Sequence, residues 1–214
     1  MVFFVFAVPL GCYQTLDLGM DTGAGDLPTL ALDGPCSRYA WLALEGMSLR
    51  MVSDEPCAAC GVSRSLAPDE HGYRSRLRRD DGTVTTAWSC NNQRVSVRQL
   101  TYDGDETDVD AYDPPVVRWV EGKDIGESWT TNSEVTRMRN GVLQDVSQVT
   151  VTYTVEGWET LSLAPGDFET VRLREEESGA LRWISEGFGL VQVVDENGTS
   201  VLSGLSWPGE DTGQ

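Results

Sequence analysis

The chain has 214 residues, of which 40% are hydrophobic and seven are tryptophan, and its formal net charge is −18, from 34 acidic and 16 basic residues. Such an acidic chain repels phosphate backbones, so we expect no nucleic-acid partner, because nucleic-acid binding depends on Lys and Arg that neutralise phosphates. The hydrophobic fraction supports a folded core, and the length suits one domain, or two short halves of related design.

Residues 1–11 form an apolar segment without a charged residue. Its length is that of a signal-peptide apolar region and is too short for a transmembrane helix. Residues 8–12 (VPLGC) resemble a bacterial lipobox, in which the cysteine is acylated and becomes the new N-terminus, although Pro9 stands where an aliphatic residue is usual. We expect residues 1–12 to be a lipoprotein signal segment and Cys12 to carry a lipid anchor, with plain secretion and a buried first strand as the alternatives.

Residues 13–35 contain no Lys or Arg and are rich in Gly, Asp, Thr and Pro. Such a segment buries too little apolar surface to offset the entropy of ordering it, so we predict a flexible tether. The folded domain is expected over residues 36–207, either as one unit or as half-repeats 36–115 and 116–207. Residues 208–214 are expected to form a disordered tail.

Beyond the tether, hydrophobicity alternates with a period of two. Arg74, Arg76 and Arg78 alternate with Tyr73 and Leu77, and Asp81-Gly82 follows as a hairpin turn. The same alternation continues to the C-terminus, with turns at Ser178-Gly179 and Asn197-Gly198, and no helical stripe exceeds about two turns. The pattern predicts an all-β fold: a curved antiparallel meander, half-barrel or barrel-like, with few or no helices.

Three segments carry a family resemblance: residues 122–129 (GKDIGESW), 163–168 (LAPGDF) and 187–191 (GFGLV). In this order they resemble a group of exported bacterial β-domains sometimes labelled TapB-like, over residues 120–205. The resemblance implies a curved antiparallel sheet and residence in the cell envelope, and it implies no activity.

The same residues also have a mechanical interpretation. Pro165 fixes φ and Gly166 permits a positive φ, which predicts a tight turn at residues 164–167, with Phe168 starting the next strand towards the core. Gly187 and Gly189 indicate a bulge or sharp bend where a larger side chain would clash. A ligand-contacting role for either turn is the alternative.

With Cys12 assigned to the lipid, an even number of cysteines remains, which in an oxidising compartment indicates two disulfides. A disulfide between Cys57 and Cys60 would close a strained small ring, so we expect each of these cysteines to pair with Cys36 or Cys90. Three connectivities are formally open. A zinc site is an alternative, but four-cysteine sites usually have two closely spaced pairs and this chain has one. A redox-active pair would require a βαβ context that the sequence lacks.

Catalytic motifs are scarce. His71 is the only histidine, which excludes a His-rich metal site, and no serine lies in a G-x-S-x-G elbow. The acidic run 103–113 (DGDETDVDAYD) lacks the glycine and the closing glutamate of an EF-hand loop, with Asp108 and Pro114 in those places. We expect this run to be a solvated connector, and we expect no cofactor and no catalytic residue. The alternative is a calcium site formed by Asp103, Asp105, Asp108 and Asp110.

Arg74, Arg76 and Arg78 form an unusual basic row in so acidic a chain. If exposed, such forked donors suit carboxylate or phosphate groups; the alternative is pairing with the protein's own acids.

We expect a non-catalytic, lipid-anchored protein of the bacterial cell envelope, with the outer membrane or cell surface favoured, that binds an envelope protein, glycan or lipid. The alternatives are a calcium- or zinc-binding protein and a carboxylate-dependent hydrolase. The hydrolase would require an open cleft beside two buried carboxylates, lined by residues among Trp88, Trp119, Trp129 and Trp183.

Overall fold

The computed structural model describes residues 47–53, 61–69, 72–91 and 93–206, without the side chains of residues 64–69. These residues form twelve strands and no helix, which confirms the all-β prediction. The strands are β1 (Ser48–Ser53), β2 (Gly61–Asp69), β3 (Gly72–Arg79), β4 (Gly82–Asn91), β5 (Arg94–Asp103), β6 (Thr107–Val120), β7 (Ser128–Arg139), β8 (Val142–Leu163), β9 (Gly166–Glu175), β10 (Leu181–Ser185), β11 (Gly189–Asp195) and β12 (Gly198–Ser206). The described residues contain no helix long and apolar enough to cross a membrane.

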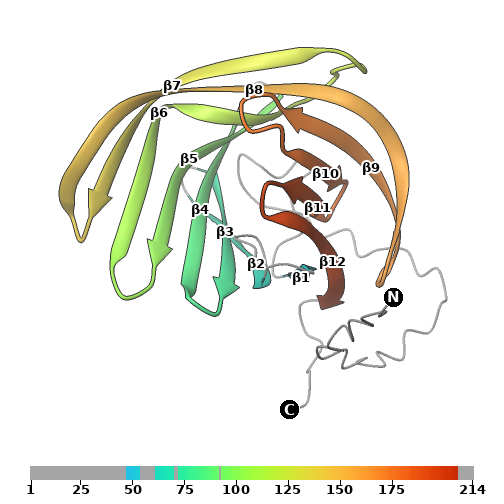
Figure 1. The fold of residues 1–214 in the computed structure, drawn as a ribbon, viewed down its shortest axis with the longest axis horizontal. Coiled ribbons are helices and arrows are strands. Elements are labelled where there is room, and N and C mark those ends of the chain that lie inside the picture. Colours follow the sequence, from blue (N-terminus) through green and yellow to red (C-terminus); the bar gives the residue numbers. More distant parts are fainter. Residues whose placement is uncertain (1–46, 54–60, 70–71, 92, 207–214) are drawn as a thin grey trace, which may run out of the picture.

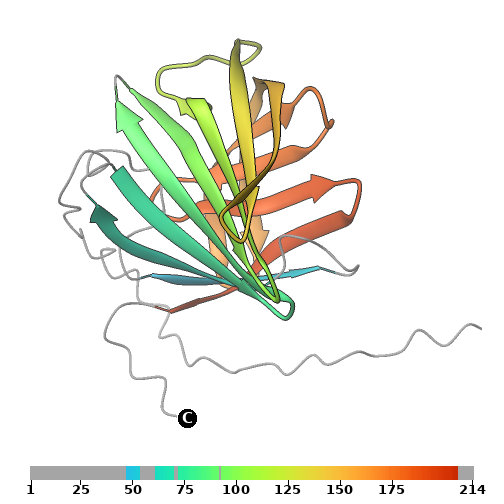
Figure 2. The ribbon, with the colours of Figure 1, turned by 90° about the vertical axis from the view of Figure 1, so that its left-hand side faces the viewer.

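The strands follow one another as an antiparallel meander that closes into a barrel (Figures 1 and 2). β1 pairs with both β2 and β12, so closure joins the first strand to the last. Closure pairs the first and last strands with each other, whereas in an open sheet their unpaired backbone groups would invite pairing with another chain. In Figure 1, the long strands β8 and β9 curve around the short strands β10–β12.

Several turns lie where Gly, Asn, Asp and Pro predict them. Three returning strands begin with a glycine paired to the residue just before a two-residue turn: Gly82 with Arg79, Gly166 with Leu163, and Gly198 with Asp195. Gly82, Gly166 and Gly198 all have positive φ, which a side chain would strain. Pro165 lies in the turn between β8 and β9, and Phe168 is buried two residues into β9.

The predicted clash at Gly187 is wrong. Gly187 has φ +77° and Gly189 has φ +74°, but a Cβ atom added at Gly187 would meet no heavy atom within 4 Å. The glycine is therefore required by backbone conformation and not by lack of space. A register shift does follow these turns, since Trp183 pairs with Gln192 and Ile184 with Leu190, which leaves one extra residue in β11.

The expected solvated connector at residues 103–113 is wrong for most of its length. Only residues 104–106 connect two strands, and β6 begins at Thr107. Aspartates are poor strand formers, but Asp108 lies opposite Arg139 and Asp110 opposite Arg137 in β7, so cross-strand charge pairs compensate. β6 also runs without a break through residues 115 and 116, so the proposed half-repeat boundary would fall within a strand.

The interior holds two hydrophobic clusters. One gathers residues of β3–β6, β8 and β9, including Tyr73, Trp119 and Leu173. The other lies among β1 and β9–β12 and includes Met47 and Trp183. Barrels of about eight strands are filled by their own side chains or hold one small ligand, whereas those of 16 or more leave a channel. A twelve-stranded barrel therefore has room for side-chain clusters with a cavity between them.

Candidate functional site: the barrel interior

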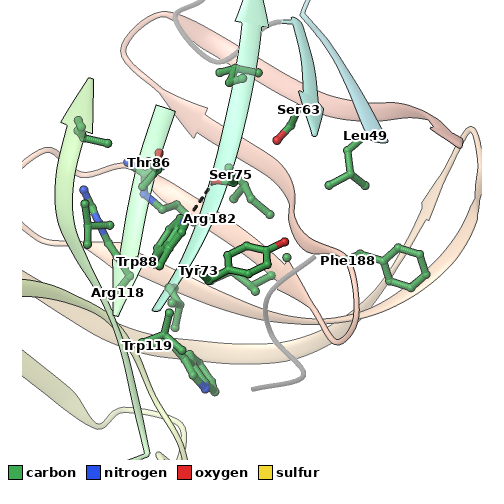
Figure 3. Close-up of a pocket in the computed structure, with 18 of the residues that line it drawn as sticks. Leu49, Ser63, Tyr73, Ser75, Thr86, Trp88, Arg118, Trp119, Arg182 and Phe188 are labelled. Atoms are coloured by element: carbon green, nitrogen blue, oxygen red, sulfur yellow. Dashed lines mark hydrogen bonds between the residues drawn. The ribbon is translucent and has the colours of Figure 1, made fainter. Parts of the chain in front are cut away.

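A cavity of about 300 Å³ lies between the two clusters (Figure 3). Its wall is formed by side chains from β1–β6 and β8–β11 and from Phe188 in the β10–β11 turn. Most of these side chains are apolar, and the polar ones are Ser63, Ser75, Thr86, Tyr73, Tyr153, Arg118 and Arg182. Among the described residues of the lining there is no Asp, Glu or His.

Two of the four tryptophans singled out from the sequence line the cavity. They are Trp88 and Trp119, and Trp88 Nε1 donates a hydrogen bond to Ser75 Oγ at 2.9 Å (Figure 3). Trp129 lies behind Trp119, with ring centroids 6.2 Å apart in an edge-to-face arrangement. Trp183 belongs to the second cluster, where its Nε1 donates to Glu159 Oε1 at 2.8 Å.

Two arginines, Arg118 of β6 and Arg182 of β10, face the same interior. β6 carries one residue more than β5 between the pairs Val95–Trp119 and Ser96–Val117, so Arg118 is the bulged residue. A bulge changes the direction of a side chain, and here both Arg118 and Trp119 line the cavity. Arg182 lies in β10 opposite Leu173, another residue of the lining.

A single carboxylate, Glu175 at the end of β9, joins the two arginines. Glu175 Oε2 accepts hydrogen bonds from Arg182 Nη2 at 3.0 Å, Arg182 Nε at 3.2 Å and the Tyr153 hydroxyl at 2.9 Å. Arg118 Nη1 donates to the Tyr153 hydroxyl and lies 3.5 Å from Glu175 Oε2. Arg118 also lies over the Tyr153 ring, 5.6 Å from its centroid. The network therefore holds two guanidinium groups, one carboxylate and one phenol.

Burial governs the electrostatics of this region. It lowers the pKa of Arg118, with the positive charge of Arg182 as the second cause, but a guanidinium stays protonated in proteins. Burial raises the pKa of Tyr112 to about 12, and Asp110 adds to the shift. Desolvation also raises the pKa of Asp110, against the opposing effect of Arg137, whose Nε lies 3.7 Å from that carboxylate.

The basic row of β3 lies on the outer face of the barrel. Arg74, Arg76 and Arg78 are exposed, while the alternating Ser75 and Leu77 line the interior cavity. Arg50 of β1 lies opposite Val62 of β2, which lies opposite Arg78, so the row broadens across three strands. An outer groove of about 630 Å³ is lined by Arg50, Met51, Val52, Gly61, Val62, Arg76, Arg78, Arg79 and Asp80. Within the part of the chain that the structure describes, Arg50, Arg76 and Arg78 form no ion pair.

The acidic run does not form the calcium site considered from the sequence. Asp108 accepts two hydrogen bonds from Arg139, at 2.7 and 3.1 Å, and Asp110 lies beside Arg137. Asp103 Oδ1 accepts a hydrogen bond from the Thr107 hydroxyl. No group of three His, Cys, Asp or Glu residues that could hold a metal ion occurs among the described residues.

Most of the remaining predicted residues lie outside the part of the chain that the structure describes. Cys12, Cys36, Cys57, Cys60 and His71 lie outside the described residues, so the lipid anchor and the disulfide pairing stay predictions. Cys90 is buried at the end of β4, in contact with the first hydrophobic cluster.

Comparison with known proteins adds no relative: no family model, no curated protein and no solved structure matches the chain. The resemblance to TapB-like domains therefore stays a prediction.

The sequence did not single out Arg118, Tyr153, Glu175 or Arg182. A signal was present, since Arg118 and Arg182 each interrupt an apolar strand segment directly before a tryptophan, in VVRWV and ALRWI. An arginine inside such a segment must either reach the surface or find a partner in the interior.

Proposed function

We propose that this protein is a non-catalytic binding module of the bacterial cell envelope that takes a small, largely apolar ligand inside its barrel. The observation that carries the proposal is the mostly apolar cavity of about 300 Å³, to which nearly every strand contributes. Ligand cavities commonly start at roughly this size and combine an apolar wall with a few polar groups. At roughly 30 Å³ for a group the size of a water molecule, the space holds about ten non-hydrogen atoms.

A carboxylate-dependent hydrolase is the weaker candidate. Such an enzyme needs two carboxyl groups facing the substrate, one as acid and one as base or nucleophile. The described lining contributes none, and Glu175 lies behind the arginines with Oε2 already accepting several hydrogen bonds. Binding without turnover therefore accounts better for this interior.

The envelope setting rests on the N-terminal segment and the cysteines. An acylated Cys12, followed by a tether over residues 13–35, would hold the barrel at a membrane. Disulfides that join Cys36 and Cys90 to Cys57 and Cys60 fit an exported protein.

The outer arginines support a second contact, with anionic lipid headgroups of that membrane. Arg50, Arg76 and Arg78 present charges without an ion-pair partner among the described residues, next to the exposed Val52 and Val62. Replacing Arg50, Arg76 and Arg78 together by serine should reduce sedimentation with phosphatidylglycerol vesicles and leave the unfolding temperature unchanged, because none of the three has an ion-pair partner among the described residues. Unchanged sedimentation, or equal sedimentation with phosphatidylcholine vesicles, would contradict this contact.

The cavity proposal is tested with decan-1-ol, a neutral ligand of suitable size, by isothermal titration calorimetry. Thr86 lines the cavity, and the adjacent Thr85 lies opposite the exposed Arg76, on the other face of the sheet. We expect wild type and Thr85→Phe to bind decanol, and Thr86→Phe to bind at least about tenfold more weakly, because the ring would occupy the ligand's space. Absence of binding by the wild type, or equal binding by Thr86→Phe, would overturn the proposal.

A further inference from the structure

Three donor atoms of the arginine pair have no hydrogen-bond partner in the described part of the chain. They are Nε and Nη2 of Arg118 and Nη1 of Arg182, since every hydrogen bond of these side chains uses the other nitrogens. None of the three is sealed in the protein interior, and both side chains line the cavity. Charged donors therefore face a mostly apolar space, which is costly unless water or a ligand satisfies them.

The charges of the network also do not cancel. Arg118 and Arg182 contribute two positive charges and Glu175 one negative charge, so one positive charge is left over. Asp110, farther along β6, is paired with Arg137 and does not neutralise it. A ligand with a single negative charge would balance the site, whereas a doubly charged ligand would be repelled by Glu175.

We propose that Arg118 and Arg182 bind the head group of an amphipathic carboxylate, whose apolar tail occupies the cavity. This inference rests on the proposed function and names its ligand class. The forked guanidinium groups match the two oxygens of a carboxylate. The tail would lie against Leu77, Trp88 and Val97, which line the same space.

Glu175 and Tyr153 act as positioning residues in this site. Glu175 Oε2 fixes Arg182 through two hydrogen bonds, and the Tyr153 hydroxyl connects Arg118 to the same oxygen. Both arginines are therefore held in place before the ligand arrives, which lowers the entropy lost on binding.

The test compares decanoate with decan-1-ol, which share the tail and differ in the head group. We expect the full-length protein to bind decanoate at least about tenfold more tightly than decanol, because hydrogen bonds between charged groups outweigh neutral ones in a water-poor site. Arg118→Met and Arg182→Met should each lose this preference, measured as the ratio of the decanoate affinity to the decanol affinity of the same variant. Arg174→Met is the matched control, since Arg174 lies in β9 beside Glu175, on the opposite face, paired with Glu156.

The outcomes separate this inference from the proposed function. Binding of decanol without a preference for decanoate would overturn the head-group assignment and leave the cavity ligand intact. Failure of both ligands to bind would overturn the proposed function. Tighter binding of decyl phosphate than of decanoate would contradict the assignment to a singly charged carboxylate. If Arg118→Met does not fold, Arg118→Lys serves instead, because it keeps the charge and loses the fork; unchanged decanoate preference in Arg118→Lys would count against the inference.

Discussion

Burial determines how the Tyr112 phenol titrates. Its pKa is raised to about 12 by desolvation and by Asp110, above the value of about 10 for an exposed tyrosine. A raised pKa means that the folded state holds the proton more tightly than the unfolded state. Its contribution to stability is therefore present below about pH 10 and is lost as the pH rises towards about 12.

Denaturant unfolding across this range checks the prediction. The free energy of unfolding should fall more steeply with pH in the wild type than in Tyr112→Phe, which has no proton to lose. Equal slopes for the two proteins would show that the phenol ionises as freely in the folded state as in the unfolded chain.

Gly187 is the simplest position at which to measure what a side chain costs at positive φ, because nothing crowds the site. Gly187 has φ +77° and open space where a Cβ would lie, so Gly187→Ala should lower the free energy of unfolding by roughly 1–2 kcal/mol through strain alone. Gly157→Ala in β8 is the control, because Gly157 does not have a positive φ and a Cβ there would only touch Arg172 Nη2 at 4.0 Å. Equal costs for the two variants in urea unfolding would contradict the conformational explanation.

At the scale of elements, the regular strands could be predicted and the irregular ones could not. Residues 72–79 alternate so clearly that the strand follows from the sequence, as does the turn before β9, whereas the alternation alone left open which face of the strand is exposed. The strand at residues 107–113 was missed because its aspartates are stabilised by Arg137 and Arg139, which lie about 30 residues later and become neighbours only after β6 and β7 pair.

The site was missed for a related reason. Arg118 faces the cavity because β6 has one residue more than β5 at that point, and a bulge depends on the register between two strands. Alternation within one segment carries no information about that register. Glu175 and Arg182 meet across the β9–β10 connection. The alternation within these strands does not predict that this pair lies next to Arg118 of β6.

Cys90 at the end of β4 is predicted to form a disulfide with a cysteine outside the described residues. Peptide mapping without reductant should find Cys36 and Cys90 each joined to Cys57 or Cys60. Removing a native disulfide costs roughly 2–5 kcal/mol, so Cys90→Ala should lower the unfolding temperature, whereas the wild type should lose the same amount on reduction. Stoichiometric zinc in protein purified without reductant would contradict the disulfide assignment.

At the scale of the whole molecule, the closed barrel is observed, whereas the lipid anchor at Cys12 stays a prediction. Closure creates the interior, and an acylated Cys12 would place that interior next to a membrane. In a bacterial host, the mature protein should begin at an acylated Cys12 by intact mass, and Cys12→Ala should move it to the soluble fraction. Mature protein that still carries residues 1–11 would contradict the anchor and leave the barrel's binding properties unaffected.

If Arg118 and Arg182 bind an amphipathic carboxylate in the barrel interior, a crystal structure of the full chain with decanoate should show the ligand there. The predicted result is a carboxylate within about 3 Å of Arg118 Nε or Nη2 and of Arg182 Nη1, with the tail against Leu77, Trp88 and Val97. An empty interior, or decanoate held only on the outer face at Arg76 and Arg78, would contradict the claim.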